Sequence, residues 1–190
     1  LQLKSFFARS IAIVSTMSGG KLVAGGVFTT YNGQSAPRIA RLNTTGSLDT
    51  TFNPGTGPNG AVTAVSPVED GKVLIGGAFT TYNGSSTNRI ARLNTDGTLD
   101  ATFNIGTGAN QPIYTFCTSP EGKYYAAGSF TTFNGSSTGG IVRLNTDGSI
   151  DTSFAPVSGI ASSSATVRDC DVQSDGKLIL SGIFNEYDGN

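Results

Sequence analysis

Two groups of acidic residues in this chain have types and spacings that could do chemistry. The first is a turn of the form N-x-D-G-x-[LI]-D, which places oxygen-bearing side chains at alternate positions around a glycine, as calcium loops do. The candidate metal ligands are Asn94, Asp96 and Asp100, and one repeat later Asn145, Asp147 and Asp151. The turn lacks the bidentate glutamate of a calcium loop, and Thr45 replaces the first aspartate in an earlier copy. Calcium is therefore the one cofactor suggested, and a purely structural turn is the favoured interpretation.

The second group is Arg168-Asp169-Cys170-Asp171, which breaks a pattern of apolar and small residues at the same place elsewhere. Asp169 and Asp171 are two residues apart, so they point to the same side of a strand. Paired carboxylates can bind a cation or transfer protons. The alternative, which we favour, is a solvated channel lining or an internal ion pair with Arg168. These three residues are the candidate binding site.

Other chemistry is limited by composition. The chain contains no histidine, which removes Ser-His-Asp and Cys-His nucleophile arrangements and the commonest transition-metal ligand. The net charge of −1 gives no electrostatic basis for binding nucleic acid, and no apolar run approaches the ~20 residues of a membrane-spanning helix. Lysines follow glycine at 21, 72, 123 and 177; their recurrence suggests solvent-facing turns rather than a phosphate-binding loop.

These residues are set in an internal repeat. The segment G-K-V-L-I-G-G-A-F-T-T, which starts at Gly71, has counterparts that start at Gly20, Gly122 and Gly176. The spacing of about 51 residues indicates a repeat architecture. A residue that recurs in every repeat is expected to serve the packing of the repeat, and a residue that breaks the pattern is a better candidate for a unique site.

One repeat reads as four strands, expected at 61–66, 72–80, 89–94 and 98–103, with a polar loop at 83–88. The glycines at 76 and 77 would permit a bulge or the close approach of another backbone. Four antiparallel strands per ~50 residues are typical of one blade of a β-propeller. The first strand of a propeller blade lines the central channel, which is where the group at 168–171 would then lie.

The turn at 94–97 fixes a register between the last two strands. A type I turn followed by a left-handed glycine pairs Leu93 with Leu99 and Arg92 with Asp100. The same register predicts one cross-strand ion pair in every complete repeat. The expected pairs are Arg41 with Asp49, Arg92 with Asp100, and Arg143 with Asp151.

Aromatic residues recur at three positions of the repeat. We expect them to form the core between blades, in preference to a ladder that stacks sugars. They are Phe28, Phe79, Phe130 and Phe184; Tyr31, Tyr82, Phe133 and Tyr187; and Phe52, Phe103 and Phe154. The two cysteines, Cys117 and Cys170, fall in neighbouring slots of equivalent strands, and we interpret them as two buried thiols in preference to a disulfide.

The fold class predicted is all-β, with about three and a half propeller blades forming an incomplete ring. The whole chain, 1–190, is one repeat domain with units at about 9–59, 60–110 and 111–164 and a partial unit at 165–190. Because propellers close with four to eight blades, we expect a fragment of a longer propeller. Two copies completing a ring, or an extended stack, are the alternatives. The expected partners are therefore the rest of the same propeller or other copies of the chain.

The motif G-K-[VL]-[LV]-x-G-G-x-F-T-T-Y-N-G, followed by R-I-A-R-L-N-T-x-G-[ST]-L-D-x-T-F-N, resembles the delta-60 repeat of bacterial and phage β-propeller proteins. The resemblance covers residues 11–190. It departs in the last unit, where Asn185-Glu186 replaces Thr-Thr. It implies large secreted or surface-attached proteins and supplies no catalytic residues.

Two functions remain open. The favoured one is a non-enzymatic structural or binding module of a secreted, cell-surface or virion protein, such as an adhesin or a phage fibre. Its partner would be a polysaccharide or a surface protein. The alternative is a polysaccharide lyase or hydrolase with its site in the propeller channel, an idea that rests on fold analogy.

Overall fold

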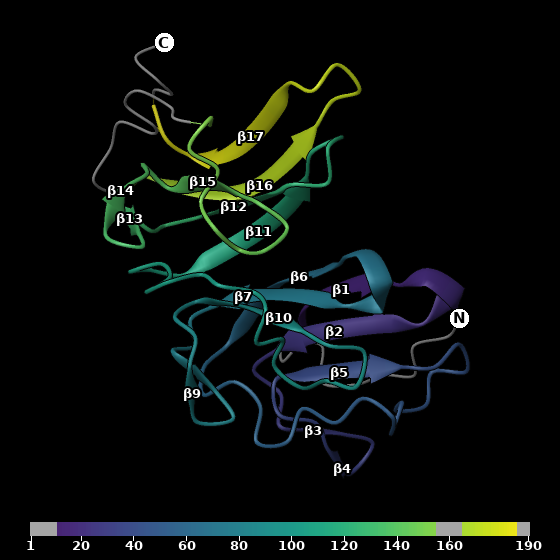
Figure 1. The fold of residues 1–190 in the computed structure, drawn as a ribbon. Helices are drawn as coiled ribbons and strands as arrows, with labels where there is room; N and C mark the ends of the chain where they lie inside the picture. Colours follow the sequence, from purple (N-terminus) through teal and green to yellow (C-terminus); the bar gives the residue numbers. More distant parts are fainter. Residues whose placement is uncertain (1–10, 155–164, 186–190) are drawn as a thin grey trace.

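The computed structural model describes residues 11–154 and 165–185 as a series of small antiparallel sheets that follow one another along the chain (Figure 1). Each of the first three repeats forms a three-stranded sheet in which the middle strand pairs with both others. The described part of the fourth repeat forms a two-stranded sheet. Tyr187 lies outside the described residues, as do the start of the first expected unit, the end of the third and the end of the fourth.

The sheets are built from strands of four to seven residues. The first comprises β1 (Ile11–Thr16), β2 (Leu22–Gly26) and β5 (Ile39–Leu42). The second comprises β6 (Val62–Pro67), β7 (Val73–Gly77) and β10 (Ile90–Leu93). The third comprises β11 (Ile113–Thr118), β12 (Tyr124–Gly128) and β15 (Ile141–Leu144), and the fourth comprises β16 (Thr166–Val172) and β17 (Leu178–Ile183). Short 3₁₀ turns, Ser18–Gly20 and Glu69–Gly71, join the first two strands of the first two repeats.

The expected fourth strand is reduced to a single bridge in each complete repeat. Leu93 pairs with Leu99 in the predicted register, and the equivalent bridges join Leu42 to Leu48 and Leu144 to Ile150. Beyond the bridge, the chain turns away after Asp100, whose amide donates to the Arg92 carbonyl. The turn itself forms as expected, because Gly97 has a φ of 88° and its amide donates to the Asn94 carbonyl.

The segment expected as a polar loop contains a short hairpin in every complete repeat. In the second repeat β8 (Thr81–Tyr82) pairs with β9 (Ser85–Ser86) around Asn83 and Gly84, which have φ of 48° and 78°. Positive φ at both central residues is the geometry that an Asn-Gly pair favours in a two-residue hairpin turn. The equivalent hairpins are β3 (Thr30–Tyr31) with β4 (Gln34–Ser35), and β13 (Thr132–Phe133) with β14 (Ser136–Ser137).

A β-bulge that recurs in every repeat explains the glycines of the middle strand. Val62 pairs with Gly77 and Ala64 pairs with Gly76, so Thr63 is an extra residue in β6. A Cβ on Gly77 would overlap the carbonyl oxygen of Ala61. The bulge and the close backbone approach expected from the sequence are both present, and the same irregularity recurs in the first, third and fourth sheets.

The hydrophobic core lies between successive sheets, as expected of stacked blades. Phe79 and Tyr82 of the second repeat are fully buried in one cluster with Val23 and Phe52 of the first repeat. Phe130 and Phe133 of the third repeat are likewise buried in one cluster with Leu74, Ile90 and Phe103 of the second repeat. Since these rings are covered by neighbouring sheets, they form the core and offer no exposed ladder for sugars.

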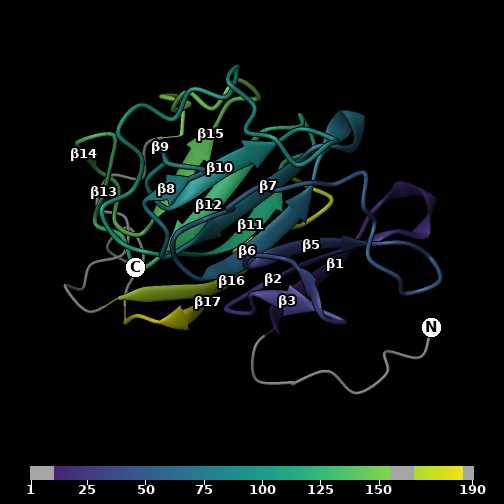
Figure 2. The same ribbon diagram turned by 90° about the horizontal axis from the view of Figure 1, so that it is seen from below.

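The first strands of successive sheets, β1, β6, β11 and β16, lie next to one another (Figure 2). Among the described residues, no helix is long and apolar enough to cross a membrane. The architecture is therefore a fan of β-blades whose inner edge is formed by the first strand of each repeat.

Candidate functional site

The recurring acidic turn holds an ion pair in each complete repeat. Arg92 Nε lies 2.7 Å from Asp100 Oδ2, and both side chains are at least nine-tenths buried. The equivalent distances are 2.8 Å for Arg41 with Asp49 and 2.7 Å for Arg143 with Asp151. All three ion pairs expected from the turn register are thus present.

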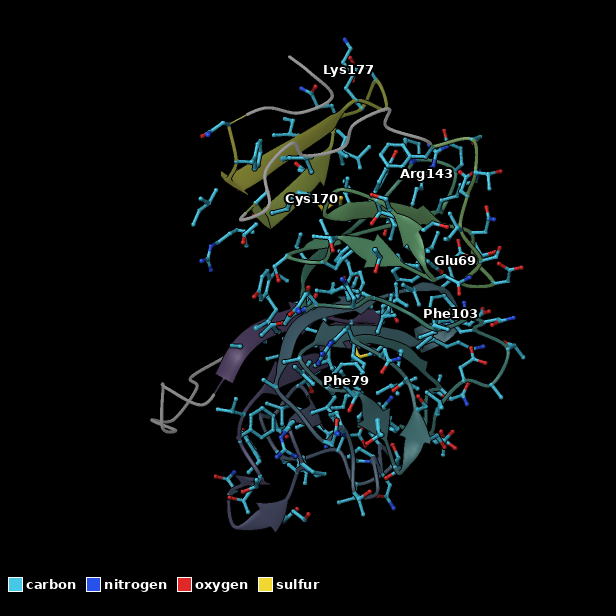
Figure 3. All side chains as sticks on the ribbon, turned by 90° about the vertical axis from the view of Figure 1, so that its left-hand side faces the viewer. Glu69, Phe79, Phe103, Arg143, Cys170 and Lys177 are labelled. Atoms are coloured by element: carbon cyan, nitrogen blue, oxygen red, sulfur yellow. A yellow bond between two sulfur atoms is a disulfide. The ribbon has the colours of Figure 1, made fainter. Side chains whose placement is uncertain are left out.

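A lysine completes each pair. Lys72 Nζ lies 2.9 Å from the same Asp100 oxygen, and Lys21 and Lys123 make the equivalent contacts at 2.7 Å. The Gly-Lys lysines were expected in solvent-facing turns, and these three side chains remain 29–40% exposed, but their ion pairs with the aspartates were not expected from the sequence. Each lysine precedes its aspartate by 28 residues in the sequence, and this constant spacing was the signal that could have revealed the pairing. Lys177 differs: it pairs with its neighbour Asp175, is 77% exposed and points away from the sheet (Figure 3).

The aspartate is further held by the residue two positions later. Thr102 donates both its amide and its hydroxyl to Asp100 Oδ1, at 3.0 and 2.7 Å. Burial raises the pKa of Asp100, but the hydrogen bonds from Lys72, Thr102 and Arg92 outweigh it and hold that pKa well below the ordinary value. The pKa of Asp49 is lowered in the same way, against the effect of burial, by Lys21, Thr51 and Arg41.

The arginine also links one blade to the next. Arg92 Nη1 donates to the carbonyl of Thr146 in the following repeat, and Arg41 Nη1 donates to that of Thr95 at 2.6 Å. The Arg92 guanidinium lies 4.7 Å from the centroid of the Phe103 ring, a cation–π contact. The recurring charges therefore join strands within a blade and join adjacent blades, which is an architectural role.

The candidate metal ligands are directed to different partners. Asp96 Oδ1 accepts from the amide and hydroxyl of Thr98, and Asn94 Nδ2 donates to the Thr98 hydroxyl. Asp100 binds Lys72 and Arg92, as described above. In the third repeat, Asp147 accepts from Ser149, Asn145 donates to Ser149, and Asp151 binds Lys123 and Arg143. Within the described residues, no cluster of three acidic or cysteine side chains is arranged to hold a metal ion.

The irregular group on β16 lies at the surface. Arg168, Asp169 and Asp171 are exposed, and Arg168 lies over the Tyr114 ring, 6.0 Å from its centroid. Asp169 Oδ1 accepts from the Thr115 hydroxyl of the neighbouring strand at 3.2 Å. Arg168 occupies the extra position of the bulge, since Val167 and Asp169 pair with Gly182 and Ser181. Asp171 pairs with the exposed Ile179 on the side of the sheet opposite Leu178 and Leu180, whereas Asp169 Oδ1 reaches back to β11 through its contact with Thr115.

Cys117 and Cys170 form a disulfide, so the expectation of two buried thiols was wrong. In the repeat pattern the two cysteines are offset by one position, which had favoured two separate buried thiols. However, when each first strand is counted from the residue before its bulge (Ile113 in β11, Val167 in β16), the fifth residue of β11 faces the fourth residue of β16. The Cα atoms of Cys117 and Cys170 are therefore 6.0 Å apart, within disulfide range. The bridge connects β11 to β16, between the third and fourth sheets (Figure 3).

A pocket recurs at the outer edge of two blades. In the second repeat it has a volume of about 210 Å³, between the β8–β9 hairpin, β10 and the segment that follows the single bridge. Its counterpart in the third repeat has a volume of about 270 Å³. Shared lining positions, 51 residues apart, include Ser86 and Ser137 and also Thr87 and Thr138. The buried hydroxyls of Thr87 and Thr138 have no hydrogen-bond partner among the described residues. Sequence patterns gave no indication of this pocket.

Comparison with known families places the chain among β-propellers. The family described as a domain of unknown function (DUF5122) beta-propeller matches residues 20–52, 69–103, 120–154 and 173–190, and the chain belongs to this family. No curated protein sequence matches it.

Several solved propellers have a similar fold. The extracellular domain of the one-component system BT4673 from B. thetaiotaomicron gives a TM-score of 0.59 at 12% identity, covering 96% of this chain and 21% of that one. Virginiamycin B lyase from Staphylococcus aureus, crystallised with quinupristin as the inactive H270A variant, gives 0.55 at 18%, covering 93% and 50%. YCF48 bound to D1 peptide gives 0.51 at 12%, covering 96% and 49%. The present chain thus spans half or less of each of these proteins, and at these identities the similarity establishes the fold alone.

Proposed function

We propose that this chain is a non-enzymatic binding or structural propeller module of a secreted, cell-surface or virion protein, with delta-60-type repeats. The observation that carries the proposal is that the recurring charged side chains are paired with one another inside the fold. Asp49, Asp100 and Asp151, the carboxylates placed most regularly for chemistry, are each neutralised by a lysine and an arginine. Groups held in this way stabilise a scaffold and are not free to transfer protons.

The disulfide supports a location outside the cytoplasm. Disulfides persist in oxidising compartments and are rare where glutathione keeps thiols reduced. Cys117 and Cys170 are the only cysteines in the chain, and they are joined. Some propellers of similar fold are extracellular domains, such as that of BT4673, which agrees with this proposal.

The recurrent edge pocket is the place where we expect a partner to bind. The pocket combines apolar walls from Ile90 and Leu99 with the exposed hydroxyl of Ser86, so it can contact both the apolar face and the hydroxyl groups of a sugar ring. Because the same pocket occurs on neighbouring blades, a polymer with regular units could occupy both and gain avidity. A surface polysaccharide is therefore the favoured ligand class.

A direct test is a glycan-array screen followed by calorimetry with the best polysaccharide. Replacing Ser86 and Ser137 by tryptophan should fill both pockets and abolish binding. Ser18→Trp, an exposed serine remote from the pockets, should leave binding unchanged. The proposal is contradicted if the full-length protein turns over a polymer and Asp171→Asn or Asp169→Asn abolishes that turnover, because the lyase or hydrolase alternative requires those carboxylates.

A further inference from the structure

The outward side of the fourth sheet has a composition that the other sheets lack. We call it the open face and define it by Asp169, Asp171, Ile179 and Ser181, all of which are exposed. Asp169 lies at the border of this face, because its Oδ1 accepts a hydrogen bond from Thr115 of the third sheet. In the second sheet, the equivalent positions are Ala64, Ser66, Leu74 and Gly76. Of these, Leu74 and Gly76 pack against residues of the third sheet. The open face therefore retains a large apolar residue, Ile179, which is 50% exposed, but it replaces two small residues by carboxylates.

The interface between the third and fourth sheets shows which residues of successive first strands meet. Counting from the residue before the bulge, the fifth residue of an inner strand faces the fourth residue of the next, as Cys117 faces Cys170. The third residue faces the third and fourth of the next, since the Thr115 hydroxyl contacts Asp169 Oδ1 at 3.2 Å and Cys170 Sγ at 3.9 Å. By this register, a blade stacked on the open face would place its fourth residue against Asp171 and Asp169.

The first sheet, at the opposite end of the row of blades, shows which residue of a second copy would contact the open face. The fourth residue of β1 is Val14, which is 40% exposed. Its counterpart Val65 packs against Gly25 of the preceding sheet, so Val14 points away from β6, toward a preceding blade. Stacking one copy on another would set the Val14 side chain against Asp171. Burying a carboxylate against an apolar group without a partner is strongly unfavourable.

We propose that the open face docks a further blade of the same repeat family, and that the inner strand of this blade carries lysine or arginine at its fourth position. Within the described residues, neither Asp169 nor Asp171 has an ion-pair partner. A cation at that position would neutralise them while the apolar part of the blade covers Ile179. The first blade of a second copy lacks that cation and is not the occupant.

The test uses this chain, with Val14→Arg standing in for the basic blade. Sedimentation velocity should show little self-association of the native chain, and association at least about tenfold tighter for Val14→Arg at low salt, because complementary charge is restored. Adding Asp169→Asn and Asp171→Asn to Val14→Arg should remove the gain. Raising the salt concentration should weaken it.

A second variant tests the carboxylate from the other side. Asp171→Val makes the open face match the Val14 end, so it should also strengthen association, but without sensitivity to salt. Far-ultraviolet circular dichroism checks that all variants fold. The proposal is overturned if the native chain already associates tightly, or if Val14→Arg and Asp171→Val both behave as the native chain does. Neither result depends on whether the edge pockets bind a polysaccharide.

Discussion

Asp100 Oδ2 accepts a hydrogen bond from Arg92 Nε, on the neighbouring strand, at 2.7 Å, and the same arginine donates through Nη1 to the carbonyl of Thr146 in the next blade. One guanidinium therefore joins two strands and two repeats. Because the pair is also hydrogen-bonded to Lys72 and Thr102, its charges are compensated inside the fold. This relationship makes the recurring charges structural, and the following predictions test its consequences.

Removing the arginine should strongly destabilise the fold. Arg92→Ala leaves the buried Asp100 with fewer partners and removes the contact to Thr146, so we expect a loss of about 3 kcal/mol in the free energy of unfolding. Urea titration followed by circular dichroism measures it. Lys177→Ala is the matched control: its pair with Asp175 is exposed and local, so the change should stay below about 0.5 kcal/mol. Equal effects of the two substitutions would contradict the structural role.

Stability should depend on pH in the acidic range. The pKa of Asp49 and that of Asp100 are lower in the folded chain than in the unfolded chain. The unfolded state therefore binds protons first, and the stabilisation, complete above about pH 4, should be lost progressively as the pH falls further. Urea titrations at a series of pH values check this. Asp49→Asn with Asp100→Asn should flatten the dependence, and an unchanged slope in that variant would count against the assignment.

Two adjacent glycines should differ in their tolerance of a methyl group. Gly77→Ala places a Cβ on the backbone carbonyl of Ala61, so the bulge must distort, and we expect a loss of about 3 kcal/mol or failure to fold. Gly76→Ala meets only side-chain atoms, Ile113 Cγ2 at 2.8 Å and the Phe116 ring at 2.9 Å. The third repeat already has Ala127 there, so the cost should be about 1 kcal/mol. Thermal unfolding of both variants measures the two losses of stability. A larger loss for Gly76→Ala than for Gly77→Ala would refute the explanation from the backbone clash.

Reduction of the disulfide should loosen the fourth sheet. The bridge between Cys117 and Cys170 closes a loop of 53 residues, which corresponds to a stabilisation of about 4 kcal/mol in the chain-entropy account. A reducing agent should lower the midpoint of thermal unfolding in the native chain and have no effect on the variant with both cysteines replaced by alanine. If denatured, unreduced protein reacts with a thiol reagent at two sites, the disulfide is absent.

The sequence predicted the fold class because the repeat is locally consistent. The regular spacing of Phe79, Tyr82 and Phe103 reflects packing between successive blades, and the Asn94–Gly97 turn reflects local turn geometry within one blade. The ion pair of Arg92 with Asp100 followed from the turn register alone. Local patterns were sufficient for these features because the residues concerned lie in adjacent strands.

Features that depend on contacts between distant segments were missed. The pairing of Lys72 with Asp100 joins residues 28 apart, and the disulfide joins residues 53 apart in different blades. The hairpin at Asn83 was hidden for another reason, since two-residue strands are too short to show alternation, although the Asn-Gly pair itself favours the turn. The edge pocket arises where the outer segment leaves the Leu93–Leu99 bridge, which no sequence periodicity records.

The most direct test of the architectural role of the recurring carboxylates is the free energy of unfolding of Asp100→Asn, measured by urea titration with calcium and with a chelator. We predict that the native chain is equally stable in both conditions and that the substitution lowers stability by the same amount in each, because Lys72 and Arg92 are the partners of Asp100. A native chain that calcium stabilises, with the gain lost in Asp100→Asn, would show instead that the turn is a metal site.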